Sequence, residues 1–151
     1  MKNLLLILIC IPFIGFGQEL NKPFVKVDQM PLLSNCENEA CTNAEIMNFI
    51  SKNFHYPEQA KINEIEGKMI LSFIVEKDGS VNDVEMIRGI NSDIYLNSKS
   101  DSIQILIKKA ISSLHNESIN LLSKLVFDKP GFQDNKAVRV RYTIPINCKL
   151  N

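Results

Sequence analysis

The side chains of this 151-residue chain that could do chemistry are few: four cysteines, two histidines and a small group of serines. Hydrolytic catalysis needs a nucleophile beside a base, or a pair of acids, in a cleft. Ser112, Ser113 and His115 come nearest to such a group, but they lie within a run of helical periodicity. No nucleophile elbow, glycine-rich loop or metal-ligand spacing surrounds them. The sequence therefore predicts a protein that is not an enzyme and that uses no cofactor.

The cysteines favour a disulfide over a metal site. Cys36 and Cys41 are close together in the sequence, just before a predicted helix. A structural zinc site needs a full set of tetrahedral ligands, and His55 and His115 are isolated rather than at ligand spacing. In an oxidising compartment a local Cys36–Cys41 bridge is the simplest pairing. Cys148 falls on the inward face of the last predicted strand, where we expect it to act as a small buried hydrophobe.

The start of the chain has the pattern of a secretory signal peptide. A basic residue is followed by an apolar run over residues 4–16, which ends in Gly15-Phe16-Gly17. The run is shorter than the roughly 20 residues that span a bilayer. Cys10 raises the alternative of a lipoprotein, but Ile9 stands where such processing favours a small residue. We therefore predict that residues 1–17 are removed and that the protein is periplasmic or exported, with lipidation as the less favoured alternative.

The charge of the chain excludes one class of partner. Its 17 basic residues balance its 17 acidic residues, so that the formal net charge is zero. Nucleic-acid binding depends on a basic excess, which is missing here. Residues 18–33 contain Pro23 and Pro31 and have no sustained period, which predicts an extended leader. The remaining residues, 34–151, are expected to form one domain.

The elements that position these residues follow from hydrophobic periodicity and turn signals. In order, we expect a helix over 43–53, a short helix over 57–63, strands over 68–76 and 81–88, a helical region over 103–125 and a last strand over 137–150. Thr42 and Glu45 have the spacing of a capping box before the first helix. Residues 77–80 have the composition of a hairpin turn, and a bulge is expected near Asn82. The pattern leaves open whether 103–125 is one helix or two.

The last strand carries the cleanest periodic signal in the chain. Its inward positions are apolar at every second residue: Val138, Val140, Tyr142, Ile144, Ile146, Cys148 and Leu150. Pro145 lies on the opposite phase, and because proline cannot donate to a ladder it is tolerated in a sheet mainly at an edge. The last strand is therefore predicted to be an edge strand. Arg139 and Arg141 could protect this edge from promiscuous pairing, or the edge could accept a strand from a partner.

These elements predict an α+β fold. The strand over 68–76 is apolar on both faces, as a central strand requires. A hairpin followed by a helix and a third strand closes most simply with the first strand in the middle and the last at an edge. We therefore expect a three-stranded antiparallel or mixed sheet with helices on one face, preceded by one or two short helices.

The order and spacing of five short motifs resemble the C-terminal domain of TonB, the periplasmic energy transducer of Gram-negative bacteria. The motifs are Tyr56-Pro57-x-x-Ala60, Ile65-Glu66-Gly67, Phe73-x-Val75-x-Lys77-Asp78-Gly79-Ser80-Val81, Phe127-x-x-Pro130-Gly131 and Val138-x-Val140-x-Tyr142-x-Ile144-Pro145-Ile146. The resemblance covers roughly residue 33 to the end of the chain. It implies a domain that binds the TonB box, an N-terminal segment of outer-membrane TonB-dependent receptors, by adding it as a strand beside the last strand.

Carried over residue by residue, the resemblance places the partner-binding region on two stretches. The residues are Asn53, Tyr56, Pro57, Val138, Arg139, Val140, Arg141, Tyr142 and Thr143. Tyr56-Pro57 has a structural interpretation as well, a helix stop with a buried ring. For the two arginines a solvated edge face is the alternative.

The chain also departs from the family. A full transducer of this family has a lasting membrane anchor and a long proline-rich spacer, whereas this chain has a predicted cleavable signal and a short leader. Phe127 stands where the family usually has Trp, and Cys148 stands where it usually has Phe. The alternative function is a structural or interaction domain that uses its edge strand for homodimerisation or for another envelope partner.

Overall fold

The computed structural model describes residues 22–97 and 99–150. The predicted signal peptide, with Cys10, lies outside this range. The elements are α1 (Glu39–Asn53), α2 (Glu58–Ile62), β1 (Gly67–Val75), β2 (Val81–Arg88), α3 (Asp93–Leu96), α4 (Asp101–Leu122), β3 (Gly131–Gln133), β4 (Lys136–Val138) and β5 (Val140–Cys148).

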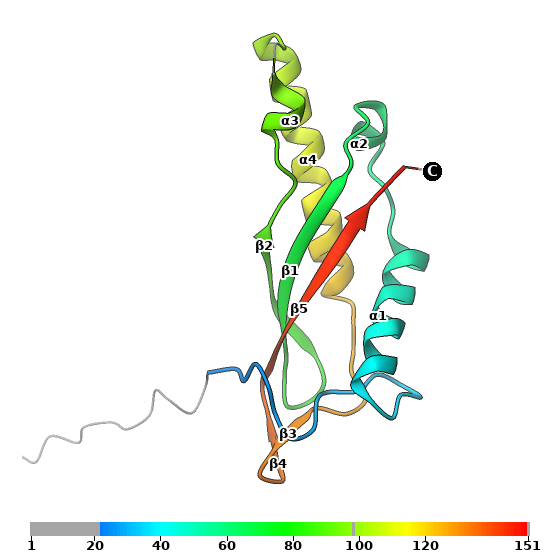
Figure 1. The fold of residues 1–151 in the computed structure, drawn as a ribbon, viewed down its shortest axis with the longest axis vertical. Helices are drawn as coiled ribbons and strands as arrows, with labels where there is room; N and C mark the ends of the chain where they lie inside the picture. The colour runs from blue at the N-terminus through cyan, green and yellow to red at the C-terminus, as the bar shows by residue number, and fades with distance from the viewer. Residues whose placement is uncertain (1–21, 98, 151) are drawn as a thin grey trace, which may run out of the picture.

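The main sheet has the order β2-β1-β5, and both of its pairings are antiparallel. Figure 1 shows β1 in the middle, β5 at one edge and α4 crossing behind the sheet. The inward side chains of α1 and α4, such as Ile46 and Leu114, share one core with those of β1 and β5. The predicted α+β fold, with the first strand central and the last at an edge, is confirmed. The predicted bulge is present as well, since the β1–β2 register shifts where Asp83 has φ +49°.

Three aromatic rings of the core pack against one another. Phe73 stacks on Tyr142 with ring centroids 5.5 Å apart, and Phe127 packs against both rings at a tilt. The Tyr142 hydroxyl donates a hydrogen bond to the Pro31 carbonyl oxygen at 3.1 Å, and burial raises the pKa of this phenol. The leader is therefore packed against the domain through its proline, although the sequence placed the domain boundary after residue 33.

The turn between β1 and β2 supports the same cluster. Gly79 has φ +85°, in the region that favours glycine. Its carbonyl oxygen accepts a hydrogen bond from the Phe127 N–H at 2.8 Å, which fixes the segment that leads from α4 toward β5. The predicted turn over 77–80 is confirmed, and it also holds a distant part of the chain.

The first helix begins earlier than expected. Asn38 is its N-cap, with its side-chain oxygen 2.9 Å from the Cys41 N–H. Thr42 is fully buried inside α1, and its hydroxyl oxygen accepts from the Leu33 N–H at 3.4 Å. The capping box predicted at Thr42 and Glu45 is therefore wrong. Asn is as good a cap as Thr, and the cap at Asn38 adds a turn to the helix.

The last strand is shorter than expected. Residues 137 and 138 belong to β4, which pairs with β3 in a separate two-stranded sheet. Asp134 and Asn135, with φ of 50° and 59°, form the turn between them. The continuous strand predicted over 137–150 is therefore wrong at its start, because a local hairpin pairs these residues first.

The helical region is a single element. α4 runs without interruption past His115, whose Nε2 atom accepts a hydrogen bond from the Ile90 N–H at 3.0 Å. This bond ties the middle of the helix to the end of β2. Burial lowers the pKa of the imidazole, which favours the neutral form that the bond requires.

The disulfide between Cys36 and Cys41 is present, with the two Cα atoms 5.5 Å apart, and Cys148 is free and buried. The prediction for all three residues is confirmed. The bridge joins Cys36, which precedes the N-cap Asn38, to Cys41 in the first turn of α1. It therefore fixes the position of the chain where the helix begins.

Chemical modification should reproduce this pairing. When the unfolded mature protein is alkylated without reductant, mass spectrometry should find one modified cysteine, Cys148. After reduction, Cys36 and Cys41 should become modified as well. Three modified cysteines without reductant would contradict the pairing, provided that the protein was recovered from an oxidising compartment.

Candidate functional site: the edge of β5

The backbone of β5 shows which of its groups point away from the sheet. The Arg141 N–H donates to the Phe24 carbonyl oxygen at 2.7 Å, on the side away from β1. Because ladder groups alternate along a strand, the N–H of Thr143 points the same way. Pro145, opposite Ile70, lies in the same phase. Its missing donor therefore costs the sheet nothing, as predicted from the sequence.

In the part of the chain that the structure describes, only the beginning of this edge is paired. The Phe24 N–H donates to the Arg139 carbonyl oxygen at 2.8 Å, which completes an isolated parallel bridge between Phe24 and Val140. Within residues 22–97 and 99–150, no segment pairs with the outer edge from Thr143 to Asn147. This stretch therefore presents backbone donors and acceptors to solvent.

A groove of about 350 Å³ lies beside the unpaired stretch, between α1 and the end of β5. Its lining residues are Met47, Ile50, Ser51, Phe54, Tyr56, Ile146, Asn147, Cys148 and Lys149. Met47 is 43% exposed, whereas Ile50, Ile146 and Cys148 are buried. The groove thus combines an apolar floor with one large apolar side chain at its rim.

Tyr56 forms one wall of the groove. Its ring meets the ring of Phe54 edge-on, with centroids 5.9 Å apart, and its hydroxyl donates to the Ile65 carbonyl oxygen. Burial, and to a lesser extent Cys148 and Glu66 nearby, raises the pKa of this phenol to about 12. Burial also raises the pKa of the Cys148 thiol to about 11, so that the thiol stays protonated at neutral pH.

The predicted partner-binding residues lie at two places along β5. Tyr56 lies beside residues 146–149, near the end of the strand, while the predicted stretch 138–143 lies at its start. The Asn53 amide nitrogen donates to the Phe49 carbonyl oxygen of its own helix at 2.8 Å, and Pro57 is the N-cap of α2. These contacts show structural roles for Asn53 and Pro57.

The strand residues of the predicted set differ in what they expose. Val140 and Tyr142 are buried, so a partner at the edge would meet their backbone rather than their side chains. Val138 belongs to β4. Thr143 is exposed, and it is the member of the set at which the unpaired part of the edge begins.

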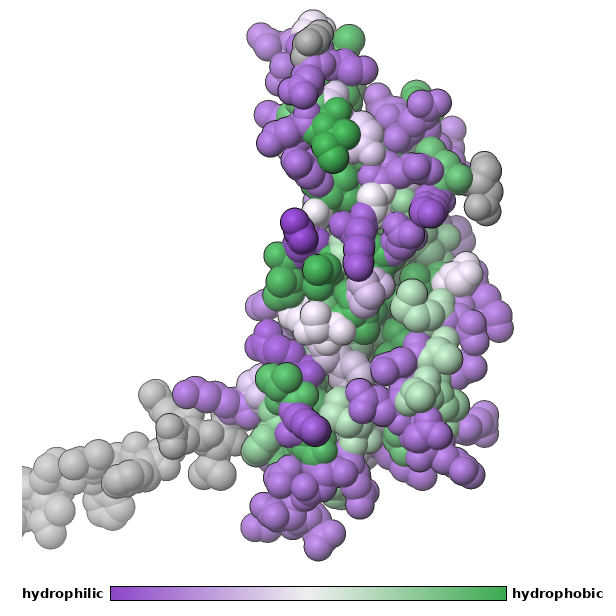
Figure 2. All heavy atoms as spheres, viewed as in Figure 1, coloured by the Kyte–Doolittle hydropathy of each residue, from purple (hydrophilic) through white to green (hydrophobic). Residues whose placement is uncertain are grey.

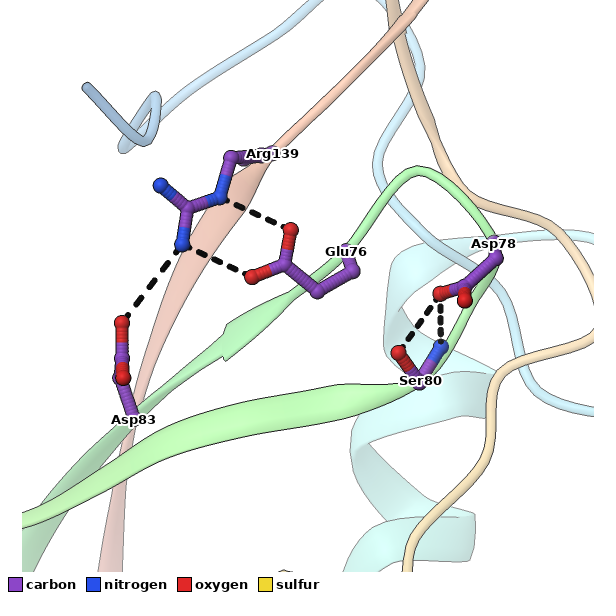
Figure 3. Close-up of polar contacts among 5 residues, drawn as sticks. All are labelled: Glu76, Asp78, Ser80, Asp83 and Arg139. Atoms are coloured by element: carbon purple, nitrogen blue, oxygen red, sulfur yellow. Dashed lines mark hydrogen bonds and ion pairs between the residues drawn. The ribbon is translucent and has the colours of Figure 1, made fainter. Parts of the chain in front are cut away.

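The two arginines lie across the helix-free face of the sheet. Arg139 donates to both carboxylate oxygens of Glu76 at 2.8 Å and lies 3.5 Å from an Asp83 oxygen (Figure 3). Arg141 lies 3.8 Å from a Glu85 oxygen. Figure 2 shows hydrophobic side chains on this view of the molecule as separate patches among hydrophilic ones. Ion pairs therefore occupy this part of the face.

Sequence reasoning missed three parts of the site: Phe24, Met47 and the stretch after Thr143. Met47 lies outside the buried stripe of α1, and a large apolar residue in such a position is a signal that could have been used. The docking of Phe24 has no such signal, because it depends on two backbone groups far away in the sequence.

Among the described residues, no helix is long and apolar enough to cross a membrane, and no cluster of three or more His, Cys, Asp or Glu could hold a metal ion. What the fold defines is an α+β domain whose edge strand is partly unpaired beside an apolar groove.

Residues 52–98 match the family model described as the Gram-negative bacterial TonB protein C-terminal. The chain is similar to this family over that stretch. Protein TonB from two strains of Helicobacter pylori is 38% identical to this chain over 50 residues, which cover 33% of this chain and 18% of each relative. The matched stretch is therefore less than a fifth of the length of those relatives.

Two solution structures of the C-terminal domain of Helicobacter pylori TonB are similar to this chain. One is 24% identical and covers 72% of this chain and 79% of its own, with a TM-score of 0.39. The other is 28% identical and covers 69% of this chain and 88% of its own, with a TM-score of 0.35.

Proposed function

We propose that this protein binds an extended peptide segment by adding it as a strand to the outer edge of β5, in support of TonB-dependent transport. The partner is an outer-membrane receptor segment of the TonB-box kind, and the protein acts in the periplasm. The observation that carries the proposal is the unpaired edge from Thr143 to Asn147 beside an apolar groove. The match of residues 52–98 to the TonB C-terminal family supports it.

The geometry of strand addition assigns a role to each side of the incoming segment. Its main chain would bond to the outward groups of Thr143 and Asn147 and to the carbonyl oxygen of Pro145. Alternate side chains of a strand point to opposite faces. Those on the helix side would therefore lie over the groove between Met47 and Ile146. The main chain supplies affinity and the groove supplies selectivity, as in other cases of β-augmentation.

The test is a calorimetric titration with synthetic peptides from the N-terminal segments of TonB-dependent receptors of the same genome. Met47→Glu should weaken the best of them by about tenfold, because it puts a charge at the rim of an apolar groove. Ile105→Glu on α4 is the matched control, since Ile105 is also an exposed apolar residue on a helix. Equal affinities of the two variants would contradict the groove. No binding by any peptide would contradict the function.

The alternative, homodimerisation through β5, uses the same backbone groups. Size-exclusion chromatography distinguishes the two. A monomer that binds peptide supports the adaptor, whereas a dimer that peptide cannot dissociate supports self-pairing.

A further inference from the structure

Residues 22–25, here called the N-terminal arm, pair with the edge that the proposed function assigns to a partner. The Phe24 carbonyl oxygen accepts a hydrogen bond from the Arg141 N–H at 2.7 Å, and the Phe24 N–H donates one to the Arg139 carbonyl oxygen at 2.8 Å. The arm runs parallel to β5 at this point. It therefore satisfies the first outward-facing groups of the edge, next to the unpaired stretch that begins at Thr143.

Among the described residues, these two backbone bonds and the partly covered side chain of Phe24 hold the arm against the edge. Phe24 is 43% exposed and Val25 is 76% exposed. The leader becomes anchored only further along, where Val27 is buried and Gln29 exchanges two backbone hydrogen bonds with Phe132 at 3.1 and 2.9 Å. The arm can thus leave the edge by a local change before Val27, without disturbing the rest of the leader.

We propose that the N-terminal arm is an internal ligand of the β5 edge, which closes the edge at Arg139–Arg141 and yields it to a partner segment long enough to reach Arg141. This inference rests on the proposed function of the edge. An unpaired edge invites promiscuous pairing, and the arm shortens the part that is exposed. A short segment that covers Thr143–Asn147 coexists with the arm, whereas a longer one must displace it.

The arm therefore lowers the affinity of the β5 edge for long partner segments only. The free energy of releasing Phe24 is subtracted from the binding of a segment that extends over Arg141, and it does not enter the binding of a short one. The direction of extension matters as well. Extension toward Arg141 competes with the arm, and extension toward Lys149 does not.

The variant that tests this is Phe24→Pro, which removes the N–H that donates to the Arg139 carbonyl oxygen. Phe24→Ala is the matched control, because it removes the same side chain and keeps both backbone bonds. The first measurement is hydrogen exchange of the Arg141 amide in the free, intact protein. It should exchange about fivefold faster in Phe24→Pro than in Phe24→Ala, as expected for the loss of one hydrogen bond.

The second measurement uses the best receptor peptide from the titration above, in a short version and in versions extended at either end. Phe24→Pro should tighten the version extended over Arg141 by about fivefold. It should leave the other versions unchanged.

Equal effects on all versions, or an Arg141 amide that exchanges alike in both variants, would overturn the inference while leaving the proposed function standing. Failure of every peptide to bind would overturn both, and the exchange data would then report only on the docking of the arm.

Discussion

Replacing Gly79 with alanine should destabilise the protein by about 3 kcal/mol, more than an ordinary surface substitution in a turn. Gly79 has φ +85°, which an L-residue with a Cβ atom rarely adopts. A Cβ atom built there would lie 2.0 Å from the Phe127 carbonyl oxygen, which belongs to the backbone and cannot move aside alone. The substitution must therefore push the turn away from Phe127.

The displacement spreads because Phe127 is part of the aromatic cluster. Its N–H loses the Gly79 carbonyl acceptor, and its ring moves relative to Phe73 and Tyr142. Tyr142 belongs to β5, so the damage reaches the strand that carries the candidate site. We expect a lower midpoint of unfolding in urea with a similar m-value.

Lys77→Ala is the control, because Lys77 is an exposed residue of the same turn. It should change the free energy of unfolding by less than about 0.5 kcal/mol. If Gly79→Ala were as mild as Lys77→Ala, the close contact between this turn and Phe127 would be absent in solution.

The sequence predicted correctly those parts of the fold that depend on residues close together in the chain. The alternation from Val140 to Cys148 requires a half-buried strand, and Pro145 restricts that strand to an edge. The turn at Asp78-Gly79 follows from residue types that tolerate its backbone geometry. In each case the physical cause lies within a few residues of the effect.

The errors arose where two local signals compete. Asn38 and Thr42 are both good N-caps; Asn ranks above Thr at this position, but Thr42 also has the capping-box spacing to Glu45, which favoured the later start. Residues 137 and 138 continue the alternation of β5, but the turn at Asp134-Asn135 pairs them with β3 first. A periodic pattern shows that a strand exists and does not show where its partner changes.

The candidate site was also predicted only in part, but the physical reason is different. The edge follows from Pro145, but its division into a paired and an unpaired part depends on Phe24, which is remote in sequence. The two backbone hydrogen bonds of Phe24 do not depend on residue type, so the sequence gives no sign of them. The groove is similar, because Met47 and Ile146 are brought together by the packing of α1 beside β5.

The division of the edge makes Thr143 the sharpest position at which to test strand addition. Replacing Thr143 with proline should weaken peptide binding by about 1 to 2 kcal/mol, or roughly 5- to 30-fold, because it removes an outward donor. The fold should be affected much less. Thr143 lies opposite Ser72 in the phase of Pro145, so its N–H is not part of the ladder to β1.

Two further variants separate the backbone effect from its alternatives. Thr143→Ala removes the same side chain and keeps the N–H, so its peptide affinity should stay close to that of the parent. Ile144→Pro removes a donor in the opposite phase, where Ile144 pairs with Leu71, and should destabilise the fold by about 3 kcal/mol or more. Calorimetric titration and a urea melt of each variant supply the two measurements.

The pattern across the three variants decides the question more firmly than any one of them. Loss of binding in Thr143→Pro with an intact fold, beside normal binding in Thr143→Ala, is explained by a main-chain bond to the partner. If Thr143→Pro bound peptide as well as the parent did, strand addition at this edge would be wrong. The binding surface would then have to lie around Tyr56 and the groove without any contribution from the backbone of β5.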